Sequence, residues 1–371
     1  MSGMLALWLA ACRSTTDTST PTDTRHSGTE PALYPPADAV WTMEGFGYGQ
    51  ASYLGRSLAA HAEGPVLGAP SQFGEEGGTP YVFLPSTPFT SGKPQDDWFR
   101  FENASTWDEF EDSHQLGTEV LAPGDVTGDG VDDLVAFDDF GLRAVPSGFL
   151  VPGPLGERWA RADDPDVLPL FGPRRGAPCG DVTGDGHVDL CLDTGVMAGP
   201  LLAPASPTVT WSAFDPKEAR IAAGDLDGDG RNELVVWDRA ASALRVLTTF
   251  PPGDHDLATL ATRSIAAPTG GTVSALETGG DLDGDGREDL VVAWVSDQAE
   301  DRVRIVTDPS TTSLDSARAT WEGAANASAL GDLDGDGVDD LVLGGEVMTS
   351  GFCSGDPTVS VLLGPLHTPA G

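Results

Sequence analysis

Residues 124–134 read GDVTGDGVDDL, and four further copies of this acidic pattern follow along the chain. The copies are GDVTGDGHVDL at 180–190, GDLDGDGRNEL at 224–234, GDLDGDGREDL at 280–290 and GDLDGDGVDDL at 331–341. Each copy crowds oxygen-bearing side chains around two glycines and then enters an apolar stretch. Carboxylates at this density repel one another unless a hard cation lies among them, and Ca²⁺ takes about six to eight such oxygens. A unit repeated at this length also predicts a repeat architecture.

The spacing of the copies predicts how the chain is organised. The loops begin at intervals of 56, 44, 56 and 51 residues, which suit four-stranded blades with connections of variable length. Alternating apolar residues, 47 glycines and 29 prolines favour an all-β fold. We therefore expect a β-propeller of six four-stranded blades, with seven blades as the alternative. The expected strands that follow the loops are Asp133–Asp138, Asp189–Asp193, Glu233–Asp238, Asp289–Trp294 and Asp340–Gly345.

The two ends of the repeat region complete this count. A first blade without an acidic loop is expected from Phe46-Gly47, with strands at Pro65–Pro70 and Thr79–Pro85. The last unit stops after Val359–Leu363 and lacks one strand, while a spare strand, Ala39–Glu44 (AVWTME), precedes the first blade. Pairing these two segments would close the ring and remove an exposed edge.

The Phe-Gly and Leu-Gly-Ala-Pro (67–70) pieces of the first blade, together with the repeated Gly-Asp-x-Asp-Gly-Asp-Gly-x-x-Asp-Leu, resemble the FG-GAP repeats of integrin α-subunit head domains. Related bacterial surface proteins carry similar repeats. The resemblance covers residues 39–366 and implies a β-propeller with Ca²⁺ in the hairpin loops of several blades. It also implies a role in binding another protein or a glycan at a cell surface.

Each nine-residue loop offers side-chain oxygens at positions 1, 3, 5 and 9 and a backbone carbonyl at position 7, so up to five Ca²⁺ ions are expected. An EF-hand would need Glu at position 12, where all five loops have an apolar residue, so that interpretation is rejected. The expected ligands are Asp125, Thr127, Asp129, Val131 and Asp133; Asp181, Thr183, Asp185, His187 and Asp189; Asp225, Asp227, Asp229, Arg231 and Glu233; Asp281, Asp283, Asp285, Arg287 and Asp289; and Asp332, Asp334, Asp336, Val338 and Asp340.

Two loops have a neutral hydroxyl, Thr127 or Thr183, where the others have a carboxylate. Fewer ligand charges should weaken cation binding, so the second and third blades should lose Ca²⁺ first on chelation. Cys179 and Cys191 flank the third blade's loop and would face each other if its flanking strands pair. A disulfide at this hairpin is expected, and two buried thiols are the alternative.

The N-terminal segment is expected to be separate from the propeller. Leu9-Ala10-Ala11-Cys12 ends a short apolar run and resembles the lipobox of bacterial lipoproteins, which implies a signal peptide at 1–11 and lipid on Cys12. No Lys or Arg precedes the run, unlike the usual signal, and an uncleaved start with a chance cysteine is the alternative. Residues 12–37 are rich in Ser, Thr, Asp and Pro and are expected to form a disordered tether to a propeller at 38–371.

The formal net charge is −38, from 58 Asp and Glu against 20 Lys and Arg, which argues against nucleic acid or an anionic membrane surface as a partner. Contact with a membrane is expected only through the N-terminal lipid, and the location would be the bacterial cell envelope, as an outer-membrane lipoprotein, or outside the cell. The sequence has no HExxH, GxSxG or P-loop motif, and we expect a binding module, not an enzyme. The alternatives are an envelope polysaccharide hydrolase or lyase and a structural envelope protein.

Overall fold

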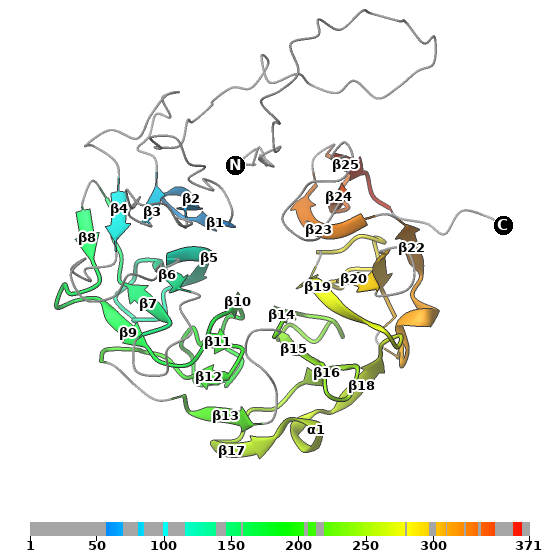
Figure 1. The fold of residues 1–371 in the computed structure, drawn as a ribbon, viewed down its shortest axis with the longest axis horizontal. Helices are drawn as coiled ribbons and strands as arrows, with labels where there is room; N and C mark the ends of the chain where they lie inside the picture. Colours follow the sequence, from blue (N-terminus) through cyan, green and yellow to red (C-terminus); the bar gives the residue numbers. More distant parts are fainter. Residues whose placement is uncertain are drawn as a thin grey trace, which may run out of the picture.

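The computed structural model describes residues 57–69, 81–84, 99–102, 116–138, 146–156, 159–203, 207–212, 219–278, 280–296, 302–308, 310–322, 324–332, 335–345 and 359–365. Its strands form six sheets that follow one another around a centre in chain order (Figure 1), and we number them sheets 1 to 6. The expected all-β, propeller-like arrangement is confirmed. The spare strand Ala39–Glu44 and Cys12 lie outside the described residues.

The first three sheets contain the N-terminal half of the strands. Sheet 1 consists of β1 (Ser57–His61), β2 (Gly64–Ala69), β3 (Tyr81–Leu84) and β4 (Phe99–Glu102), with β8 (Trp159–Arg161) added at its outer edge. Sheet 2 consists of β5 (Leu116–Gly124), β6 (Asp133–Asp138), β7 (Gly148–Val151) and β9 (Leu168–Leu170). Sheet 3 consists of β10 (Gly176–Pro178), β11 (Leu190–Leu192), β12 (Gly195–Met197) and β13 (Val209–Ser212), with β17 (Gly253–Asp256) at its outer edge.

The remaining sheets follow the same order from the centre outward. Sheet 4 consists of β14 (Ile221–Gly224), β15 (Glu233–Asp238), β16 (Ala243–Leu247) and β18 (Arg263–Ala266). Sheet 5 consists of β19 (Gly271–Thr278), β20 (Leu290–Ser296), β21 (Arg302–Val306) and β22 (Ala319–Glu322). Sheet 6 has β23 (Ala324–Gly331), β24 (Asp340–Gly345) and β25 (Val359–Leu362).

The number of complete blades differs from the expectation. Five sheets have at least four strands, whereas sheet 6 has three in the described part of the chain. The structure therefore shows five complete blades and a partial sixth, and no described strand supports a seventh. The individual strands after the acidic loops lie where the sequence predicts them, to within one or two residues at their ends.

The chain also links neighbouring sheets at their outer edges, which the sequence did not predict. Between the third and fourth strands of sheet 2, it forms β8, which pairs parallel with β4 of sheet 1. Between β16 and β18 of sheet 4, it forms β17, which pairs parallel with β13 of sheet 3, and then the short helix α1 (Leu257–Leu260). A parallel bridge from Ser313 to Ala266 links sheets 5 and 4 in the same way. In sheets 2, 4 and 5, the connection before the outermost strand thus pairs with the preceding sheet.

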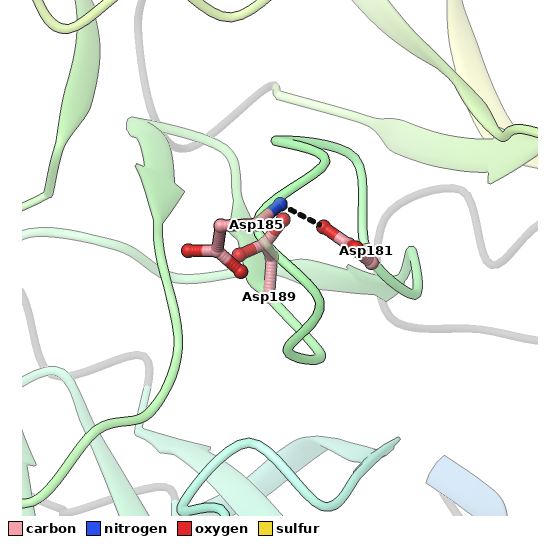
Figure 2. Close-up of side chains that lie close together, drawn as sticks. All are labelled: Asp181, Asp185 and Asp189. Carbon is pink, nitrogen blue, oxygen red and sulfur yellow. Dashed lines mark hydrogen bonds between the residues drawn. The ribbon is translucent and has the colours of Figure 1, made fainter.

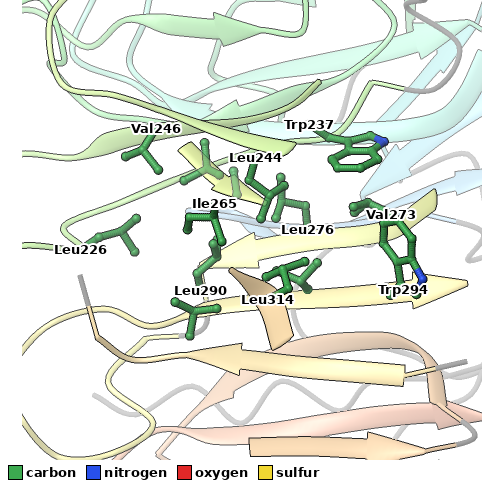
Figure 3. Close-up of a cluster of buried hydrophobic side chains, with 14 residues drawn as sticks. Leu226, Trp237, Leu244, Val246, Ile265, Val273, Leu276, Leu290, Trp294 and Leu314 are labelled. Atoms are coloured by element: carbon green, nitrogen blue, oxygen red, sulfur yellow. The ribbon is translucent and has the colours of Figure 1, made fainter. Parts of the chain in front are cut away.

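The hydrophobic core is divided into five clusters, one between each pair of consecutive sheets. Both faces of β15 are buried, because Val235 and Trp237 pack toward sheet 5 while Leu234 and Val236 pack toward sheet 3. Trp237 meets Trp294 of sheet 5 edge-on, with ring centroids 5.7 Å apart (Figure 3). Such an aromatic pair adds about 1 kcal/mol beyond the area it buries. The strand tryptophans therefore serve packing between blades at this interface.

Candidate metal centre

Each acidic loop joins the innermost strand of its sheet to the next strand, so the loops of sheets 2 to 6 lie at the same end of the blades. The loop closes on its first aspartate. In sheet 2, Asp125 Oδ1 accepts hydrogen bonds from the N–H groups of Gly128 (2.7 Å) and Asp129 (3.0 Å), and Oδ2 accepts from Gly130 (2.8 Å). The other four loops repeat these three bonds with nearly the same lengths.

Glycine is required at two positions of this turn. Gly128 and Gly130 have φ values of 77° and 91°, in the left-handed region that side chains with a Cβ rarely adopt, and the other loops match them. The side chain at the fifth position also stabilises the turn, because Asp129 Oδ1 accepts the N–H of Val131 at 2.9 Å. The loop is thus built by its own carboxylates and backbone.

These bonds gather carboxylate oxygens in a small space. Three carboxylates offer oxygens within 4.8 Å of one another in the loops of sheets 3, 4 and 5. In sheet 3 they are Asp181, Asp185 and Asp189, which come from the two sides of the turn toward one point (Figure 2). In sheets 4 and 5 they are the residues at positions 1, 3 and 5, namely Asp225, Asp227 and Asp229, and Asp281, Asp283 and Asp285. Asp334 of the last loop lies outside the described residues.

The ninth residue is a buried carboxylate in every loop, but its hydrogen bonds divide the loops into two kinds. In sheet 2, Asp133 is fully buried and accepts the N–H groups of Thr127 (2.8 Å) and Gly153 (3.0 Å). Asp189 of sheet 3 accepts from Thr183 and Gly199 in the same way, and Asp340 of sheet 6 accepts from Gly364. We call this arrangement the glycine clasp.

The glycine clasp has a sequence signature that the repeat pattern alone does not reveal. Gly153, Gly199 and Gly364 each stand in a Gly-Pro-Leu triplet after the third strand of their sheet. A Cβ on Gly153 would overlap the carbonyl oxygen of Asp132 and come within 2.6 Å of Val131 Cγ1. Only glycine brings the backbone close enough to donate to the ninth residue.

The loops of sheets 4 and 5 have no such triplet, and their ninth residues are less well satisfied. Glu233 accepts one N–H, from Leu226, and Asp289 accepts one, from Leu282. Asp289 is fully buried and its Oδ1 has no hydrogen-bond partner. Burial, reinforced by the neighbouring loop carboxylates, raises the pKa of Glu233 and of Asp289 to about 7. These two carboxylates are therefore held in an environment that disfavours their charge.

The donor set fits a hard cation. The crowded atoms are all oxygens, as Ca²⁺ and Mg²⁺ prefer, and a buried carboxylate oxygen of Asp289 lacks any other partner. A bound divalent ion would neutralise the carboxylates that raise the pKa of Asp289. The residues at position 7 of the loops were expected to offer backbone carbonyls to the ion. In all five loops, their N–H groups donate to the carboxylates at position 5.

Neighbouring loops are tied together through their eighth residues. The N–H of Glu288 donates to Asp225 O of the preceding loop at 3.0 Å. Asp339 donates to Asp281 O at 3.0 Å and accepts the N–H of Asp281 at 2.9 Å. Asn232 Nδ2 donates to Cys179 O at 3.1 Å. An ordered loop in sheets 4 to 6 therefore supports the loop before it, so the acidic loops of sheets 3 to 6 form one connected layer.

The two cysteines beside the loop of sheet 3 form a disulfide, Cys179–Cys191. Cys179 follows β10 directly and Cys191 lies within β11, and both are buried against sheet 4. The bond joins the two strands at the base of the hairpin.

Charged residues also meet at the start of the innermost strands, at the opposite end from the loops. Glu119 of β5 pairs with Arg175, which precedes β10, at 2.5 Å, and Arg220, which precedes β14, donates to Ser274 O of β19. Burial raises the pKa of Glu119 and, for Asp193, raises it to about 8. Asp193 is fully buried and accepts the N–H of Arg174, so this carboxylate holds the turn that precedes β10.

Comparison with known proteins supports the repeat assignment in part. Residues 281–343 match the family model of an FG-GAP-like repeat, which begins at the first loop residue of sheet 5 and ends within β24. Among curated proteins, no sequence matches this chain. One similar solved structure concerns recognition of non-reducing terminal N-acetylglucosamine by an Agrocybe aegerita lectin; it is 14% identical, with 81% of this chain and 77% of that chain covered and a TM-score of 0.36. At that TM-score the likeness bears on neither fold nor ligand.

Proposed function

We propose that this chain is a calcium-stabilised β-propeller that binds a protein or a glycan at the bacterial cell surface. The observation that carries the proposal is the connected layer that the acidic loops of sheets 3 to 6 form at one end of the blades. A layer whose carboxylates repel one another gains rigidity when cations fill it, and a rigid ring of loops suits recognition. The FG-GAP-like repeat at 281–343 is consistent with such a module.

Up to five Ca²⁺ ions would be held by the residues at positions 1, 3, 5 and 9 of the loops. When bound, the ion supplies positive charge that offsets the loop carboxylates. The chain's own residues do the rest: the first aspartate orders the turn through three N–H groups, and the ninth carboxylate fixes the loop to the following strand. The clasped loops of sheets 2 and 3, which have threonine at position 3, should bind Ca²⁺ more weakly than the loops of sheets 4 and 5.

The proposal includes export, with lipid on Cys12 and a tether at 12–37, and closure of the ring by Ala39–Glu44. Support for closure comes from sheet 6, where β25 is the last described strand: Val361 within it and Leu363 directly after it are 50% and 52% exposed. A strand with a matching apolar face would cover them and bring sheet 6 to four strands. Among the described residues, no helix is long and apolar enough to cross a membrane.

Two experiments address this function. A glycan array and a pull-down from bacterial envelope extract, each with calcium and with EDTA, should both be run on the full chain. We expect a ligand that is retained with calcium and lost with EDTA. Ligand binding that survives complete calcium removal with the fold intact would show that the cations do not shape the binding site. Turnover of an envelope polysaccharide in the same samples would instead favour the alternative of a hydrolase or lyase.

A further inference from the structure

An arginine from outside the loop of sheet 5 pairs with one of its carboxylates. The Arg318 guanidinium forms an ion pair with Asp283 Oδ2, the carboxylate at position 3 of the loop. Arg318 lies immediately before β22, the outermost strand of the sheet, so it reaches the loop from a different part of the blade. The Asp283 side chain is only 3% exposed, whereas that of Arg318 is 37% exposed. The carboxylate is therefore held in place while the arginine can withdraw to solvent.

The remaining oxygens of this loop are arranged so that a cation fits beside the arginine. Asp281 accepts three backbone N–H groups and keeps acceptor capacity for a cation, and Asp283 Oδ1 accepts the N–H of Asp285 at 3.2 Å. The buried Oδ1 of Asp289 has no hydrogen-bond partner, so Arg318 does not satisfy it. Arg318 thus neutralises one carboxylate of the cluster, and Arg287 Nε lies 4.0 Å from Asp285 Oδ2, but neither arginine supplies a partner for the buried Oδ1 of Asp289.

A comparison among the loops shows that the arginine accompanies the extra carboxylate. Sheet 4 also has aspartate at position 3, Asp227, and Arg263 at the start of its outermost strand β18 interacts electrostatically with Asp227 and Glu233. Sheets 2 and 3 have threonine at position 3, and their strands β9 (LPL) and β13 (VTWS) have no basic residue. In sheets 4 and 5, the extra carboxylate is thus matched by an arginine from the same blade.

We propose that Arg318 is an internal competitor of the cation in the loop of sheet 5. It occupies Asp283 when calcium is absent and keeps this part of the loop folded, and an incoming cation must displace it. The arginine therefore lowers the calcium affinity of this loop and sets the calcium concentration at which it fills. This inference rests on the proposed calcium function and adds a specific residue that tunes one site.

The test uses the full chain and a site-specific measurement. Hydrogen–deuterium exchange of the peptide spanning the loop, 280–290, is followed during a calcium titration of the stripped protein. Arg318→Gln should shift the midpoint of protection to about tenfold lower free calcium, because a positive charge at short range no longer opposes the ion. Arg318→Lys, which retains the charge, should remain near the wild-type midpoint. In EDTA, Arg318→Gln should increase exchange in this peptide, because Asp283 is left unpaired.

Two controls separate a local effect from a change in net charge. Arg161→Gln removes the same charge from β8, where Arg161 pairs with Asp163 on the surface, and should leave the midpoint unchanged. In an Asp283→Asn background, Arg318→Gln should lose its effect on the midpoint. A midpoint for Arg318→Gln within twofold of wild type, or an equal shift in the 180–190 peptide, would overturn the inference. If calcium protects no loop in the wild-type chain, the proposed calcium function itself fails.

Discussion

The same substitution at the same loop position should have opposite effects in two sheets. Asp133 and Asp289 are both ninth residues and both fully buried. Asp133 accepts N–H groups from Thr127 and Gly153 and the hydroxyl of Thr127, whereas Asp289 accepts only the N–H of Leu282 and has an unpaired Oδ1. In calcium-free protein, Asp133→Asn should therefore destabilise the fold, and Asp289→Asn should stabilise it.

The magnitudes follow from the two environments. Because the folded pKa of Asp289 is raised to about 7, its ionisation near pH 7.5 opposes folding by up to about 4 kcal/mol, relative to an ordinary aspartate. Asparagine removes this charge and still accepts the N–H of Leu282, so a net gain of about 1 to 2 kcal/mol is expected. At Asp133, the amide nitrogen of asparagine would face an N–H donor, and the loss of a charge-assisted bond should cost about 2 kcal/mol.

The assay is urea unfolding of both variants in EDTA, followed by tryptophan fluorescence and repeated in excess calcium. Trp294 lies in β20, directly after the loop of sheet 5, and reports on that blade. In calcium, Asp289→Asn should lose its advantage and become the less stable protein, because a ligand charge has been removed. Destabilisation of similar size by both substitutions in EDTA would refute the distinction between clasped and unclasped loops.

Three further predictions concern the clasp, the buried carboxylates and the disulfide. Gly153→Ala should lower the free energy of unfolding by about 3 kcal/mol, because the added Cβ has no room. Gly156 has a φ of 54° and open space around it, so Gly156→Ala should lower that free energy by only about 1 kcal/mol. Equal losses for the two variants in urea unfolding would contradict this prediction. In EDTA, the melting temperature should fall as the pH rises from about 5 to 7.5. The reason is that Glu233 and Asp289 keep their protons in the folded state up to a pKa of about 7, whereas in the unfolded chain they release them near pH 4. Saturating calcium should remove this slope, and a melting temperature that rises over this range would argue against the prediction. Replacing Cys179 and Cys191 by alanine should cost about 3 kcal/mol by freeing a short hairpin loop, and unchanged urea midpoints with and without the pair would show that it contributes nothing.

Much of the blade could be predicted from the sequence because its signals are local. The acidic turn fixes where two strands meet, since Gly128 and Gly130 allow one backbone path and Asp125 holds it. The apolar runs after each loop then have to be strands, because both of their faces are buried between sheets. The strands β6, β15 and β24 accordingly begin and end at the predicted residues.

The features that were missed depend on contacts between distant residues. Strand β17 (GDHD) has no apolar alternation, and it forms because its backbone pairs with β13 at the outer edge of another sheet. The repeat pattern does not predict the role of Arg318, because this residue lies just before the outermost strand of its blade, far from the loop in the sequence. The glycine clasp could have been found from the sequence, since Gly-Pro-Leu recurs at Gly153, Gly199 and Gly364. In sheets 2 and 3 the triplet begins about 20 residues or fewer after the ninth residue of the loop, and in sheet 6 slightly farther after it.

A calorimetric calcium titration of the full, EDTA-stripped chain tests the central claim most directly. The acidic loops are held by their own backbone but retain repelling, partly unsatisfied carboxylates, so we predict saturable binding of several calcium ions per chain, up to five. The tightest sites should be lost on Asp227→Asn or Asp283→Asn, and the melting temperature should rise with occupancy. An absence of binding heat at millimolar calcium, with the same melting temperature in calcium and in EDTA, would contradict the account.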